Sequence, residues 1–83
     1  MPKRSIVVDG IKTSISLENK FWIGLQEMAK RRNMSVSMLA SEIKKSRPAG
    51  VDRGGLSSAL RLAVLNDALS RYLEAREELE RNI

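Results

Sequence analysis

The residues whose types and spacing best suit joint binding of a ligand are Lys12, Ser14 and Ser16, three polar residues at alternate positions. In an extended segment their side chains share one face and offer an ammonium group and two hydroxyls as hydrogen-bond partners. The sequence contains no cysteine and no histidine, which removes the commonest nucleophiles, general bases and zinc ligands. We therefore expect a binding protein rather than an enzyme, with no metal and no cofactor.

The residues between these positions predict the strand that would position the row. They are apolar or β-branched, which gives the period-two pattern of a half-buried strand: Ile11, Thr13, Ile15 and Leu17. A lone strand leaves backbone groups unpaired. Residues 11–17 must therefore pair with residues 5–8 through an Asp9-Gly10 turn, or with the same segment of a second chain. The second pairing is favoured, because one chain alone would leave the inner faces of the strand and of two helices uncovered.

Helical periodicity predicts three helices after the strand. The first covers residues 18–32 and stops at Asn33, the second follows the N-cap Ser35 from residue 36 to about 45, and the third covers about residues 57–82. The chain is accordingly divided into four parts. These are a basic N-terminal arm (1–10), a strand-helix-helix domain (11–45), a Gly-rich basic linker (46–55) and a C-terminal helix for packing or oligomerisation (56–83).

Size and charge point to two kinds of partner. A chain of 83 residues forms one domain with a modest core, and without disulfides or zinc a second copy is the expected means of stabilising it. Fifteen Lys and Arg against ten Asp and Glu give a net charge of +5, which favours a polyanion, either nucleic acid or an anionic membrane surface. Neither a secretory signal nor an apolar run of about 20 residues is present, so we expect a cytoplasmic protein.

The order strand–helix–helix over residues 11–45 resembles the ribbon-helix-helix superfamily of the Arc/MetJ type. Residues 12–18 look like its ribbon entering the first helix, and residues 33–37 look like its turn into the second helix, with Asn33 where Gly is usual. A bacterial subfamily with an added C-terminal helix is similar at further positions: Arg4-Ser5, Gly10, Thr13-Ser14, Leu17-Glu18, Phe21-Trp22 and Leu56-Ser57-Ser58-Ala59-Leu60-Arg61. The resemblance implies a mainly helical, intertwined homodimer with an intermolecular antiparallel β-ribbon and a third, C-terminal helix.

The resemblance also implies a role for each candidate residue. The ribbon would enter the major groove of double-stranded DNA, with Lys12, Ser14 and Ser16 on base edges and Thr13 in support. Phosphates would be held at the start of the second helix and by basic side chains: Ser35, Val36, Ser37, Lys3, Arg4 and Arg31. The core of the dimer would contain Ile15, Leu17, Trp22, Leu25, Leu39 and Ile43.

The expected function is therefore that of a sequence-specific transcriptional repressor, cytoplasmic and associated with the nucleoid. The main alternative is an antitoxin that regulates its own operon and binds a toxin through the C-terminal helix. Residues 57–73 of that helix could instead pack on the dimer or join dimers into a higher assembly. A membrane-surface role is disfavoured, because the polar face of this helix is acidic and would repel anionic lipid: Asp67, Glu74, Glu77, Glu78 and Glu80.

Overall fold

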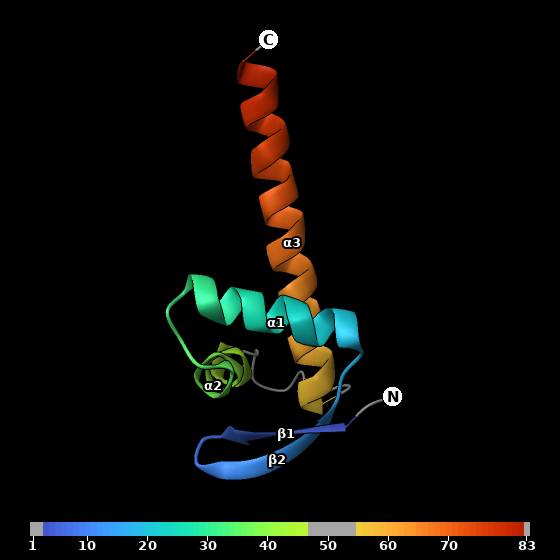
Figure 1. Cartoon of the computed structure of the whole chain (residues 1–83), viewed down its shortest axis with the longest axis vertical. Helices are drawn as coiled ribbons and strands as arrows, with labels where there is room; N and C mark the ends of the chain where they lie inside the picture. The colour runs from blue at the N-terminus through green and yellow to red at the C-terminus, as the bar shows by residue number, and fades with distance from the viewer. Residues whose placement is uncertain (1–2, 47–54, 83) are drawn as a thin grey trace.

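The structure is a computed structural model that describes residues 3–46 and 55–82. Two strands come first, β1 (Lys3–Val8) and β2 (Ile11–Ser16), and three helices follow, α1 (Asn19–Arg31), α2 (Val36–Ser46) and α3 (Gly55–Arg81). The strands form a hairpin at one end of the molecule, α1 and α2 lie over it, and α3 projects away toward the C-terminus (Figure 1). The predicted linker falls mostly on residues 47–54, which lie outside the described residues.

The two strands pair with each other in antiparallel register, from Val8 opposite Ile11 to Lys3 opposite Ser16. The turn between them is Asp9-Gly10, and both residues have positive φ, 52° and 78°. These values belong to a two-residue type I′ turn, whose twist matches that of the strands and for which Asp-Gly is a preferred sequence. The predicted turn is thus confirmed, and it closes the ribbon within one chain.

This pairing changes one expectation. Residues 3–8, expected to belong to a basic arm, form β1 and pair with β2. Pairing of residues 11–17 with a second chain stays a prediction. The physical reason is that β1 has a period-two pattern of its own. Ile6 and Val8 are 6% and 2% exposed, whereas Val7 between them is 47% exposed. β1 therefore adds the buried side chains of Ile6 and Val8 to the face that packs against the helices. Pairing within a hairpin was one of the two alternatives that the sequence left open.

The core of the described residues lies between the hairpin and the three helices. Four of the predicted core residues are at most 3% exposed, and two pack partly buried at the edge of the core. The first four are Ile15, Leu17, Leu25 and Leu39, and the other two are Trp22 and Ile43. β1 and α3 complete the core with Ile6, Val8 and Leu60. These residues form the core of one subunit, and their place in a dimer stays a prediction.

Local sequence signals set the helix ends. The Ser35 hydroxyl accepts a hydrogen bond from the Met38 backbone N–H at 3.0 Å, which is N-cap geometry. Asn33 has a φ of 55°, the left-handed conformation that commonly ends a helix and that Asn tolerates. Both boundary residues are confirmed, and all three helices lie within two residues of their predicted ranges.

α1 and α3 approach each other closely at Gly24. A Cβ atom built on Gly24 would lie 2.5 Å from Cγ1 of Val64 on α3, well inside a normal contact. Val64 is β-branched, and in a helix its χ1 angle has one strongly preferred value, so its side chain does not swing aside cheaply. Gly24 is therefore needed for the packing of α3 on α1.

Gly24→Ala should destabilise the fold by about 2 kcal/mol, because an overpacking cost near the upper end of about 1–3 kcal/mol outweighs a gain of about 1 kcal/mol in helix propensity. Urea unfolding of wild type, Gly24→Ala, Val64→Ala and the double variant measures the effect. In the Val64→Ala background, the Gly24→Ala substitution should lower the free energy of unfolding only slightly or raise it. A single Gly24→Ala variant as stable as wild type would refute the close packing.

Candidate functional site

One face of the hairpin carries a row of small polar and basic side chains from both strands. Residues directly opposite in an antiparallel pair lie on the same face. The register places Lys3, Ser5 and Val7 of β1 opposite Ser16, Ser14 and Lys12 of β2. Five of these residues are exposed and Ser16 is partly buried. We call these six residues the ribbon face, and none of them is a carboxylate.

The ribbon face brings together the row predicted to contact bases, since Lys12, Ser14 and Ser16 all lie on it. Lys3, predicted to contact phosphate, lies at one end of the same face. Val7 and Ser5 are not among the predicted residues, although they are exposed beside the row. The alternation of β1 was the signal that could have identified them.

Two predicted contact residues lie on the opposite face of the hairpin. Thr13 is partly buried, and its hydroxyl donates to the Ile11 carbonyl at 3.2 Å. The Arg4 guanidinium donates to Oδ1 of Asn19 at 2.8 Å and lies 4.7 Å from the centroid of the Trp22 ring. A cation over an aromatic face is attracted by the ring quadrupole, so Arg4 fastens β1 to the first turns of α1. Neither residue is brought to the ribbon face.

The first half of α2 covers the outer edge of β1. The Ser37 hydroxyl accepts the Val7 N–H at 3.3 Å, and the Ser41 hydroxyl accepts the Asp9 N–H at 3.1 Å. Unpaired N–H groups at a sheet edge need such partners. Ser37, predicted to contact phosphate, therefore holds the hairpin to α2.

The remaining predicted phosphate contacts are spread over the subunit. Ser35 is exposed at the start of α2, where it caps the helix. Val36 next to it packs partly buried against the core. Arg31 forms an ion pair with Asp67 of α3, so its charge is engaged between two helices.

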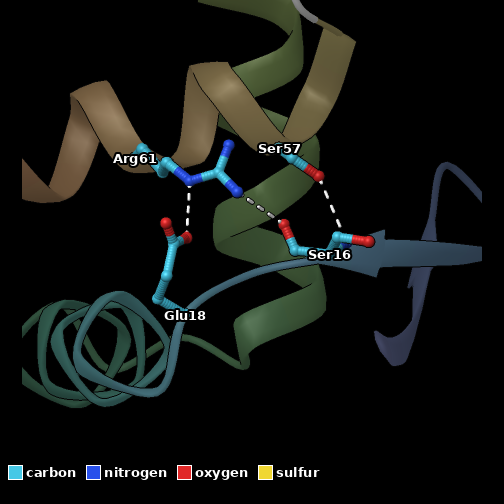
Figure 2. A network of polar contacts seen from close by, with 4 residues as sticks. All are labelled: Ser16, Glu18, Ser57 and Arg61. Carbon is cyan, nitrogen blue, oxygen red and sulfur yellow. Dashed lines mark hydrogen bonds and ion pairs between the residues drawn. The ribbon is translucent and has the colours of Figure 1, made fainter. Parts of the chain in front are cut away.

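α3 holds the end of β2. Figure 2 shows Ser57 and Arg61 of α3 reaching the backbone of Ser16 and the carboxylate of Glu18. The Ser16 N–H donates to Ser57 Oγ at 3.3 Å, and the Ser16 carbonyl accepts from Arg61 at 3.0 Å. Arg61 Nε lies 2.6 Å from Oε1 of Glu18. These contacts, which we call the Arg61 clamp, fix the point where β2 ends and α1 begins.

The sequence alone did not predict the Arg61 clamp. Glu18 and Arg61 are 43 residues apart, and no local periodicity connects them. The stretch from Leu56 to Arg61 stands out as part of the family resemblance, which is the one signal for it in the sequence. The clamp joins the start of α3 to the hairpin.

Other kinds of site find little support. Among the residues that the structure describes, no group of three or more His, Cys, Asp or Glu side chains could hold a metal ion. Within residues 3–46 and 55–82, no helix has the length and apolar character needed to cross a membrane. The chemistry that the ribbon face offers is hydrogen bonding and positive charge.

Comparison with known proteins bears on the same elements. A family model described as a ribbon-helix-helix domain matches residues 1–68, which include the hairpin, α1, α2 and the first half of α3. No curated protein and no solved structure matches the chain. The match agrees with the resemblance seen in residues 11–45 and at the further positions between Arg4 and Arg61.

The Arg61 clamp predicts how stability changes in acid. The hydrogen bond from Arg61, together with one from the Glu18 backbone, lowers the pKa of the Glu18 carboxyl below its ordinary value of 4.5. A group whose pKa is lower in the folded state contributes stability above its unfolded pKa and loses it as the pH falls through the folded one. Glu18→Gln should therefore be less stable than wild type at neutral pH and approach wild type as the pH falls below 4.5.

Urea unfolding at stepped pH measures this convergence. The matched control is Glu74→Gln, which makes the same change at an exposed position of α3. Its stability should run parallel to that of wild type across the range. A difference between wild type and Glu18→Gln that stays constant from neutral to acid pH would contradict the role of the carboxylate.

Proposed function

Because this chain belongs to the ribbon-helix-helix domain family, a family of DNA-binding regulators, we propose that it binds double-stranded DNA with the ribbon face in the major groove. The ribbon face is the observation that carries the proposal, since it is a two-stranded ribbon whose exposed side chains are lysine, serine and valine. A ribbon of this width fits the major groove, where base edges display donors, acceptors and the thymine methyl. The absence of a carboxylate from these six residues avoids repulsion by phosphates.

The ribbon face has a different group for each kind of base contact. Lys12 donates to guanine O6 or N7, and the hydroxyls of Ser5 and Ser14 donate or accept according to the base they meet. Val7, opposite Lys12, packs against a thymine methyl. Lys3, at the far end from the turn, reaches the phosphate backbone. Since the face has no Arg, Asn or Gln for a bidentate base contact, its specificity comes from several modest contacts together.

The start of α2 supports the phosphate contacts proposed for Ser35 and Val36. The hydrogen bond from Val7 to Ser37 ties this turn to the outer edge of β1. A helix N-terminus has free N–H groups and the positive end of the helix dipole, which together bind phosphate. When the ribbon lies in the groove, the flanking DNA backbone meets this turn and the exposed Ser35 hydroxyl.

We further propose that two subunits bind DNA together, because members of the family typically dimerise. The two edges of the hairpin differ in how far helices cover them. Serines of α2 satisfy N–H groups along the edge of β1, whereas α3 reaches β2 at Ser16. Alternate residues of an antiparallel strand direct their backbone N–H and C=O groups to the same edge. Lys12 and Ser14 therefore present these groups at the outer edge of β2, as Ser16 does. Pairing of two β2 strands there would give a four-stranded sheet with Lys12 and Ser14 of both chains on its two central strands. Those two strands would form the ribbon that enters the groove.

The proposed role is that of a transcriptional repressor on nucleoid DNA in the cytoplasm, since a dimer seated on a promoter blocks polymerase. The antitoxin remains a second candidate, because α3 exposes large apolar side chains such as Leu69 and Tyr72 that a protein partner could cover. Growth arrest caused by a neighbouring gene and relieved by this one would decide for the antitoxin. The fold itself belongs to a non-catalytic family.

Lys12→Ala should weaken binding to a site selected from random DNA duplexes by about 1–3 kcal/mol, because the variant loses a base contact in the groove. Fluorescence anisotropy titrations of labelled duplex measure the change. The matched control is Arg81→Ala, which removes the same charge near the C-terminal end of α3. Equal losses for the two variants would show a general charge effect and contradict readout by the ribbon face.

DNA affinity should fall steeply with salt, because phosphate contacts release counterions. In titrations between about 50 and 200 mM salt, Lys3→Ala should reduce the slope of log K against log salt by about one unit. Ser14→Ala carries no charge change and should alter the affinity while keeping the slope. A slope near zero for wild type, or an unchanged slope for Lys3→Ala, would overturn the phosphate contact.

A further inference from the structure

α3 has a second apolar face that no other described part of the chain covers. Its first turns pack on the core through Leu56, Leu60, Ala63 and Val64. Beyond them the helix continues to Arg81 and projects away from the other elements (Figure 1). Six large side chains of α3 are between 51% and 67% exposed: Leu62, Leu65, Leu69, Tyr72, Leu73 and Leu79. A contiguous exposed apolar surface of this kind marks a binding site for a protein.

Most of these residues repeat at alternating intervals of three and four. The positions that follow this spacing are Leu62, Leu65, Leu69, Tyr72, Arg76 and Leu79, which we call the α3 seam. The spacing is that of a heptad repeat, in which two positions in every seven face a partner helix in a coiled coil. At 3.6 residues per turn, the α3 seam lies on the side of the helix opposite Leu60. It is therefore separate from the face that packs on the core.

We infer that the α3 seam binds the α3 seam of a second copy of this chain, as an antiparallel two-helix coiled coil. Two identical heptad seams can pack against each other. In an antiparallel pair, the first apolar position of a heptad in one helix faces the second apolar position of a heptad in the other. The layers that result are Leu62 with Leu79, Leu65 with Arg76, and Leu69 with Tyr72. Ala68 and Ala75 flank the α3 seam on one side, and such small residues let the two helices approach closely.

The charges of α3 select the antiparallel orientation. In a parallel pair, Arg76 of one copy would face Arg76 of the other within the contact, where like charges repel. In the antiparallel pair, Arg76 faces an apolar layer and can extend its charge past it. The last turns of α3 are acidic, with four glutamates against two arginines from residue 74 to residue 81. In a parallel pair these acidic turns would lie side by side and repel each other, whereas antiparallel pairing places them at opposite ends of the contact.

The contact leaves the ribbon face untouched. The α3 seam is about 26 Å long at 1.5 Å per residue, and the hairpins would lie at opposite ends of the pair, roughly 40 Å apart. The edge of β2 proposed for DNA-bound dimers also stays open. The inference therefore stands apart from the proposed function, and each can fail without the other.

Analytical ultracentrifugation of the full chain tests the contact. Leu69→Glu/Tyr72→Glu places charge in the central layer and should halve the mass of the assembly, while circular dichroism shows helix content retained because both positions are exposed. The matched control is Ser70→Glu/Arg81→Gln, which shifts net charge equally at exposed positions outside the α3 seam and should keep the wild-type mass. A mass unchanged by the first pair, or a wild-type chain that is monomeric, overturns the inference.

Cysteine cross-linking tests the orientation, and it is clean because the sequence contains no cysteine. Chains carrying Leu65→Cys and chains carrying Arg76→Cys are mixed and gently oxidised. The antiparallel register predicts cross-linked dimers in the mixture and few in either sample alone. Efficient cross-linking within each single sample would show parallel pairing and overturn the register, as would a complete lack of cross-links in the mixture.

Discussion

Burial of one face of the β1–β2 hairpin is the constraint on which the positions of the other elements depend. Ile6, Val8 and Ile15 lie on the inner face, with Leu17 directly after β2, and all four are at most 6% exposed. Removal of each side chain from water contributes roughly 1.5–3 kcal/mol. Because side chains alternate across a strand, directing this face inward directs the other outward. The outward direction of the ribbon-face residues, including Lys12, therefore follows from burial of the apolar residues that alternate with them in each strand.

Sequence patterns predict the features that residues close together in the chain decide. The type I′ turn follows from Asp9-Gly10, the end of α1 from Asn33 and the start of α2 from Ser35, and each depends on a few neighbouring residues. The outward placement of Lys12 and Ser14 follows from strict alternation over seven residues, which a single register satisfies. These predictions hold because local geometry and the hydrophobic pattern agree.

The features that sequence patterns do not predict depend on contacts between distant segments. The sequence leaves two partners open for β2, and within the chain the partner is β1, whose Ile6 and Val8 lie in the core. Thr13 and Arg4 carry polar groups that suit a ligand, yet each finds a partner on the inner side of the hairpin. The pairing of Arg61 with Glu18 joins segments 43 residues apart, so nothing in either segment alone reveals it.

The closed core of the subunit has a consequence for exchange between assemblies. In an intertwined dimer the chains complete each other's core, so separating them means unfolding both. Here β1 pairs with β2 within the same chain, and Leu60 of α3 is buried in the same core. In the assemblies proposed above, a subunit would leave one assembly and enter another as a folded unit. Mixtures of differently labelled chains would equilibrate at the rate of dissociation rather than at the much slower rate of refolding.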